Sequence, residues 1–136
     1  MVFVTRSIHG ALSLFLVLAS STVLADWTKI SSDKDIYSAY ADKESIRRNG
    51  ALVRMAGMYD FKKQDFTPDG KGLYSTVVLR EYDCSARRVR LLSAIDFSGP
   101  MGAGTPVSTS DRPRRWEDVV AGGVDEPYWN LACGTK

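Results

Sequence analysis

Alternating apolar and polar positions run through most of the chain and predict a series of β-strands. Over residues 51–61, the apolar side chains expected on one face are Val53, Met55, Tyr59 and Phe61. Residues 87–97 alternate in the same way, and the side chains expected on one face are Val89, Leu91, Ile95 and Phe97. Shorter strands are predicted over residues 26–30 and 36–41, which are rich in aromatic and β-branched residues.

The strand predicted over residues 74–84 differs from the others, because apolar residues occur on both of its faces. One face carries Val77 and Leu79, whereas the other carries Val78 and Tyr82. A strand that is apolar on both faces is typical of a position inside a sheet that is covered from both sides. We therefore expect residues 74–84 to form a central strand.

Turn residues separate these strands at intervals that suit hairpins. Asn49-Gly50 is the strongest of these signals and predicts a type I′ turn. The polar segment 62–72 contains Pro68-Asp69-Gly70 and is predicted to be a loop with a tight reversal. Ser85-Ala86 predicts another tight turn. Neighbouring strands joined by short turns favour an antiparallel sheet.

The C-terminal third of the chain predicts a long loop followed by a short helix. Glycine, proline and serine recur through residues 98–115, where only a brief edge strand around Val107 is expected, and Trp116 is expected to fix the return of this loop. Asp125 is predicted to be the N-cap of the helix, with Pro127 in its first turn. The predicted fold class is α+β, with a single antiparallel sheet of about five to six strands and one short C-terminal helix.

Residues 1–25 have the pattern of an export signal. Arg6 supplies a positive charge, residues 11–19 form an apolar core, and Val23-Leu24-Ala25 predicts cleavage before Asp26. A spanning helix is the alternative, but it needs about 20 apolar residues, and serine and threonine interrupt this run at residues 20–22. We expect residues 26–136 to form one exported domain without a transmembrane segment.

Charge and cysteine content bear on which partners the protein binds and on the state of its two cysteines. Lysine and arginine total 18 against 16 acidic residues, a balance that gives no reason to expect nucleic-acid binding. Cys84 and Cys133 are the two cysteines, and in an exported chain such a pair favours a disulfide. A reactive or metal-binding pair is the alternative; it is disfavoured because the one histidine, His9, lies in the signal and the cysteines lack CxxC spacing.

The sequence contains no combination of residues that is typical of a catalytic site. The glycine-rich segment 99–104 is followed by no Lys-Ser/Thr pair, so it predicts a turn rather than a phosphate loop. Glu81 and Asp83 would share one strand face, where charges that solvate the sheet are the expected interpretation and an acid–base pair is the alternative. Because no histidine is present after the signal to activate a serine, we predict no enzyme activity, no metal site and no cofactor.

Several segments together are similar to one known family. They are residues 40–50, Tyr74-Ser75, residues 81–84, residues 90–93, residues 101–104, Trp116 and Cys133. In this order and spacing the chain resembles the surface-adhesin protein E family. The resemblance implies an antiparallel sheet with a C-terminal helix held against it by a Cys84–Cys133 bridge. It also implies adhesion to host proteins at a bacterial surface.

Arginines beside a tyrosine mark the candidate contact surface for a partner. Tyr82, Arg87, Arg88 and Arg90 would lie on one hairpin, and tyrosine and arginine are enriched in binding hot spots. The expected interpretation is that these arginines only solvate a sheet face and edge and discourage aggregation, and contact with a partner is the alternative. The predicted function is an exported, non-catalytic protein-binding module, with a host matrix or envelope protein as its partner. A periplasmic structural or envelope-stress component without a host ligand is the alternative; surface display and periplasmic residence are both compatible with the sequence.

Overall fold

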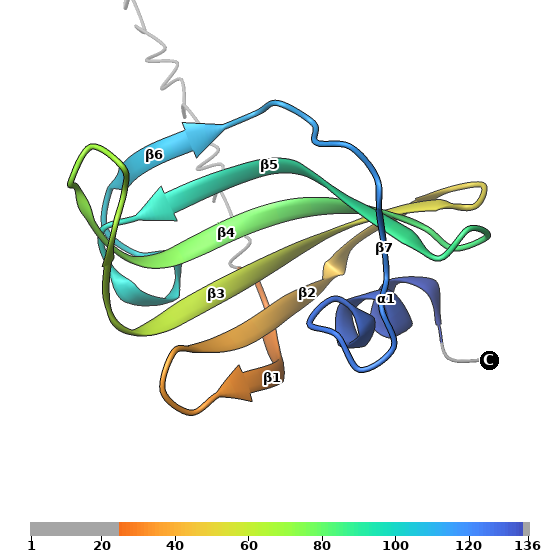
Figure 1. Ribbon diagram of the computed structural model, residues 1–136, viewed down its shortest axis with the longest axis horizontal. Helices are drawn as coiled ribbons and strands as arrows, with labels where there is room; N and C mark the ends of the chain where they lie inside the picture. The colour runs from red at the N-terminus through yellow and green to blue at the C-terminus, as the bar shows by residue number, and fades with distance from the viewer. Residues whose placement is uncertain (1–24, 135–136) are drawn as a thin grey trace, which may run out of the picture.

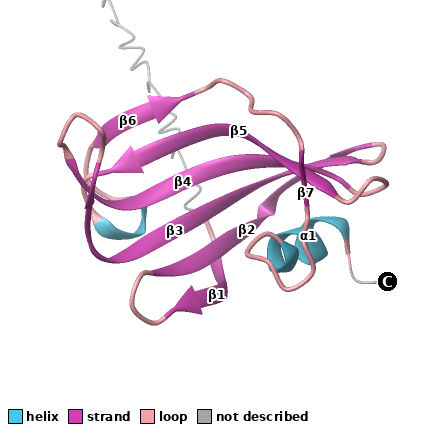
Figure 2. Cartoon of the chain, in the orientation of Figure 1, coloured by secondary structure: helices cyan, strands magenta, loops and turns pink. Residues whose placement is uncertain are grey.

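Consecutive strands pair with their neighbours along the chain and build a strongly twisted antiparallel sheet (Figure 1). The structure is a computed structural model that describes residues 25–134. The strands are β1 (Trp27–Asp33), β2 (Tyr37–Asn49), β3 (Leu52–Phe66), β4 (Gly72–Asp83), β5 (Arg88–Phe97), β6 (Pro106–Ser110) and β7 (Glu117–Asp118). The 3-10 helix η1 (Pro100–Gly102) and the α-helix α1 (Glu126–Cys133) complete the described fold (Figure 2). The predicted export signal lies almost wholly outside the described residues.

The sheet order is β1-β2-β3-β4-β5-β6, and β7 joins the outer edge of β5. Strand β6 pairs with β5 at residues 94–97, whereas β7 pairs with Arg88 and Val89. One edge of β5 therefore has two partners, and residues 111–116 pass between them. The predicted antiparallel sheet and the edge strand around Val107 are confirmed.

The polar segment 62–66 belongs to strand β3, so the predicted loop over residues 62–72 is too long. Asp65 and Phe66 pair with Leu73 and Gly72 across the hairpin. Strand pairing uses main-chain groups, which every residue except proline supplies, so a polar sequence does not prevent it. The reversal itself occupies residues 67–71, where Gly70 has a φ of 84°.

The β2–β3 turn is a hairpin turn, as predicted, but its residues are shifted by one position. Asn49 pairs with Leu52, so Gly50 and Ala51 occupy the two central positions. Gly50 has a φ of 62°, and Ala51 is not among the described residues with positive φ. This sign pattern is that of a type II′ turn rather than the predicted type I′ turn.

A β-bulge between β4 and β5 changes the faces of β5. The register shifts after Leu79, so that Val89 pairs with Tyr82 but Ile95 pairs with Val77. Tyr82 and Val77 are five positions apart and face opposite sides, so their partners do too. The prediction that Val89 and Ile95 share a face is therefore wrong.

Helix α1 covers one face of the sheet and completes the core there (Figure 1). Tyr128 and Ala132 from the helix pack with buried residues of the strands, which include Val53, Met55 and Tyr82. On the opposite face, Met58 is fully buried near η1. Strand β4 has buried residues on both faces, among them Tyr82 and Ser75, as expected of a central strand.

A disulfide between Cys84 and Cys133 ties the end of α1 to the end of β4, as predicted, with the two Cα atoms 5.5 Å apart. The start of the helix differs from the prediction. Asp125 occupies the N-cap position, but its side chain makes no capping hydrogen bond. Its carboxylate instead lies 3.9 Å from Nε of Arg80. None of the helices described over residues 25–134 is long and apolar enough to cross a membrane.

Candidate functional site: an arginine–tryptophan face

The register of the three central strands builds a row of charged side chains on the sheet face opposite α1. Arg54 of β3 pairs with Glu81 of β4, which pairs with Arg90 of β5. Arg54 donates from Nε to Glu81 over 2.9 Å, and Arg90 donates from Nε and Nη2 over 3.0 and 2.7 Å. One carboxylate thus serves two guanidinium groups, and the row carries an excess positive charge.

Glu81 is the buried centre of this row, since its side chain is only 4% exposed. Burial by itself would raise the pKa of Glu81, but the hydrogen bonds from Arg54 and Arg90 outweigh it and hold the pKa below its ordinary value. The carboxylate is therefore ionised at neutral pH. Arg54, with 55% of its side chain exposed, keeps donors that face solvent.

Trp116 extends the row at the sheet edge. The pairing of Glu117 with Val89 places the preceding Trp116 beside Arg90. The guanidinium carbons of Arg88 and Arg90 lie 5.3 and 4.6 Å from the centre of its ring, distances typical of cation–π contacts. Trp116 was expected to fix the return of the loop 98–115, and in the structure it packs against Arg88 and Arg90. We call Arg54, Glu81, Arg88, Arg90 and Trp116 the arginine–tryptophan face.

A groove of about 430 Å³ adjoins this face at the tip of the β2–β3 hairpin. Its lining adds Arg47, Arg48, Asn49 and Leu52 to Arg54, Glu81 and Arg90. Arg48 also donates to the carbonyl of Ala132 over 3.3 Å, at the C-terminal end of α1. Four arginines and one paired carboxylate make the groove cationic, which suits a surface that contacts carboxylates.

The four residues predicted from the sequence to bind a partner separate in the structure. Arg88 and Arg90 lie together on the arginine–tryptophan face. Tyr82 faces the other way and is 1% exposed, so it is a core residue and offers no contact area. Because successive side chains in a strand point to opposite faces, Tyr82 faces α1 and the neighbouring Glu81 faces the opposite side of the sheet.

Arg87 also serves the helix side. It lies in the β4–β5 turn with a φ of 50° and forms an ion pair with Glu126 of α1. Its guanidinium lies 4.8 Å from the ring centre of Trp129, and its Nε donates to the carbonyl of Val119 over 3.3 Å. Arg87 therefore fixes α1 to the turn.

The residues that the sequence prediction missed are Arg54 and Trp116. Arg54 is 27 positions from Glu81, and Trp116 meets β5 only through β7. One signal was present for Arg54: it alternates with Val53 and Met55, which marks it as facing away from them. Nothing local in the sequence identifies its partner.

Asp83 stabilises the β4–β5 turn instead of forming an acid–base pair with Glu81. It accepts hydrogen bonds from the hydroxyl and main-chain N–H of Ser85, from the N–H of Ala86 and from Arg88. These contacts, chiefly those from the Ser85 hydroxyl and Arg88, lower the pKa of Asp83 to about 2. Glu81 and Asp83 are both buried, so the expectation that they solvate the sheet is wrong; each instead accepts hydrogen bonds from arginine.

The Asp83 contacts predict a specific acid sensitivity. In the unfolded chain an aspartate titrates near about 3.9, whereas the folded pKa of Asp83 is about 2. The unfolded state therefore binds more protons between about pH 4 and pH 2, and stability is lost as the pH falls through that window. We expect Asp83→Asn to be less stable at pH 7 and to lose less stability than the parent protein between pH 4 and pH 2.

Urea unfolding from pH 2 to pH 7 measures this effect. Asp35→Asn removes an equal charge from an exposed site in the β1–β2 turn and is the matched control. If the free energy of unfolding falls between pH 4 and pH 2 as steeply in Asp83→Asn as in the parent protein, the role assigned to Asp83 is contradicted.

Fold and site together define a class of protein: a small antiparallel-sheet domain with a disulfide-tethered helix and a cationic face suited to macromolecular contact. Over residues 25–134, no three His, Cys, Asp or Glu side chains cluster in a way that could hold a metal ion. The model of the family described as surface-adhesin protein E matches residues 27–134. The chain belongs to this family, which confirms the resemblance inferred from the sequence.

Solved structures of Haemophilus influenzae protein E share the fold. Crystal form II of that protein is 12% identical, with a TM-score of 0.64 over 79% of this chain and 86% of the other. A second structure is 12% identical, with a TM-score of 0.63 over 79% and 83% of the two chains. Protein E from non-typeable Haemophilus influenzae is 15% identical, with a TM-score of 0.54 over 79% and 81%. No curated protein matches the sequence.

Proposed function

We propose that this chain is an exported, non-catalytic module that binds host proteins through its arginine–tryptophan face. The observation that carries the proposal is the excess positive charge of the Arg54–Glu81–Arg90 row beside the stacked Trp116. Membership of a family described as a surface adhesin supports a role in adhesion. The expected partner presents carboxylates, which pair with arginine through two parallel hydrogen bonds.

The fixed geometry of the face favours binding. Arg90 is held by two hydrogen bonds to Glu81 and by its contact with Trp116, so it loses little side-chain freedom when a partner docks. Arginine and tryptophan are also the side chains most enriched in binding hot spots. The neighbouring groove with Arg47 enlarges the cationic area that a partner would meet.

Capture of matrix and serum proteins by the immobilised protein tests this proposal. In the double variant Arg47→Gln/Arg54→Gln, affinity for any captured protein should fall at least roughly tenfold if either arginine is a hot spot. Arg90 still pairs with Glu81 in this variant, so the fold should persist. Arg87 is left unchanged because it fixes α1.

The double variant Lys34→Gln/Lys63→Gln is the matched control, because it removes the same charge from two other exposed sites. If both double variants lose the same affinity for the captured protein, net charge alone attracts that protein, and binding by a specific face is contradicted. If no matrix or serum protein is captured, the result favours the periplasmic structural alternative. Protease accessibility on intact cells then separates surface display from periplasmic residence.

A further inference from the structure

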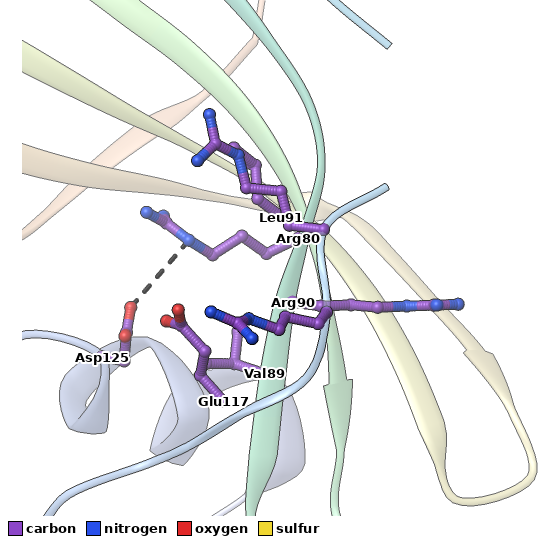
Figure 3. A pocket seen from close by; sticks show the side chains of 8 residues that line it. Arg80, Val89, Arg90, Leu91, Glu117 and Asp125 are labelled. Atoms are coloured by element: carbon purple, nitrogen blue, oxygen red, sulfur yellow. Dashed lines mark ion pairs between the residues drawn. The ribbon is translucent and has the colours of Figure 1, made fainter. Parts of the chain in front are cut away.

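A second cationic site lies near the start of α1 and shares only Arg90 with the arginine–tryptophan face. A pocket of about 210 Å³ opens where β4 and β5 meet the segment before β7 and the start of α1. The charged residues that line it are Arg80, Arg90, Arg114, Arg115, Glu117 and Asp125. Figure 3 shows Arg80 directed across the pocket toward Asp125.

Arg80 is the unusual member of this lining. Its side chain is only 16% exposed, and the Nη1 atom is buried without a hydrogen-bond partner among the described residues. Nη2 donates to the hydroxyl of Tyr59 over 3.1 Å, while the 3.9 Å between Nε and Asp125 is too long for a hydrogen bond. A buried guanidinium with an unused donor is costly unless something accepts from it.

The position of Arg80 is fixed by aromatic rings. Its guanidinium carbon lies 5.4 Å from the ring centre of Tyr59 and 5.5 Å from that of Tyr128. Both rings belong to the packed helix side of the sheet, so the donor is held in place before any ligand arrives. This preorganisation lowers the entropic cost of binding.

The remaining walls restrict what the pocket accepts. Arg114 and Arg115 are exposed and bring two further guanidinium groups from the segment before β7. Glu117 and Asp125 bring two carboxylates, which would repel a densely charged polyanion. A single compact anionic group fits both the volume and the charge.

We propose that this pocket binds one carboxylate group, with Arg80 as its buried anchor and Arg114 and Arg115 closing over it. The carboxylate comes either from a small free acid or from an aspartate or glutamate side chain of a protein. Arg80, Arg114 and Arg115 lie outside the arginine–tryptophan face, so this carboxylate site can exist even if the proposed adhesion does not.

Titration of the purified protein, followed by NMR of the arginine Nε–H signals, tests the site. The probes are propionate, the peptide acetyl-Ala-Glu-Ala-amide and its neutral counterpart acetyl-Ala-Gln-Ala-amide. We expect saturable shifts of the Arg80 signal with a carboxylate probe and affinity at least about tenfold weaker for the glutamine peptide. Tighter binding of the glutamate peptide than of propionate would identify a protein side chain as the source, and the reverse order a free acid.

Two variants complete the test. Arg114→Ser/Arg115→Ser should weaken carboxylate binding at least about tenfold, and the fold should persist because both side chains are exposed. Arg112→Ser, which removes an exposed arginine outside the pocket lining, should change the affinity by less than about twofold. Equal binding of the glutamate and glutamine peptides, full binding by the double variant, or no shift with either carboxylate probe would overturn the proposal.

Discussion

Replacing Cys133 with alanine should lower the free energy of unfolding by about 4 kcal/mol. The bridge to Cys84 closes a loop with a sequence separation of 49, and a cross-link of that length restricts the unfolded chain strongly. Total stabilities of small domains are about 5–15 kcal/mol, so this loss is a large share. Urea unfolding of the variant and of the parent protein, under identical conditions, measures it.

Thiol labelling supplies the control for the disulfide prediction. The parent protein, unfolded in non-reducing buffer, should show no reactive thiol. The double variant Cys84→Ala/Cys133→Ala should be as unstable as the single variant, because both lack the same bridge. Two labelled thiols in the parent protein, or a stability unchanged by Cys133→Ala, would contradict the prediction.

Tyr128→Ala should cost about 3–5 kcal/mol, the range for a large buried aromatic side chain. Tyr128 is 1% exposed and belongs to the core between α1 and the sheet. Its hydroxyl donates to the carbonyl of Tyr40 over 3.1 Å. Its ring rests on Gly57, where an added Cβ would come within 2.9 Å of Tyr128 Cε1. Removal of the ring would therefore leave a cavity under the helix.

Two further variants separate the contributions at Tyr128. Tyr128→Phe keeps the ring and should cost about 1 kcal/mol, the typical value of one hydrogen bond. Tyr74→Ala changes a tyrosine that is 36% exposed and should cost much less than Tyr128→Ala. Equal losses for Tyr74→Ala and Tyr128→Ala in urea unfolding would mean that Tyr128 does not hold the helix to the sheet.

Local sequence signals predicted most of the fold. Alternation at every second position identified the strands over residues 51–61 and 87–97, because side chains in a strand point to opposite faces in turn. Asp125 and Pro127 also predicted the start of α1. The cysteine count and the export pattern were enough to favour the disulfide.

The candidate site was predicted only in part. Arg88 and Arg90 were identified as arginines on the same predicted hairpin as Tyr82. Tyr82 was included for its residue type, although the alternation of β4 directs it toward the core. Arg87 was included for its position in the turn, but contacts with Glu126 and Trp129 determine its role, and both lie about forty residues away in the sequence.

The sequence by itself therefore determined the approximate positions of β3, β4 and β5 and the apolar face of most strands, and it favoured a disulfide between the two cysteines. Only the tertiary structure decided the strand register, the bulge that turns Ile95 away from Val89, and the passage of Trp116 beside Arg90. It also decided that Asp125 approaches Arg80 instead of capping its own helix. The physical reason is that alternation and turn propensity act between near neighbours, whereas register and ion pairing depend on main-chain hydrogen bonds and charges between segments far apart in the chain.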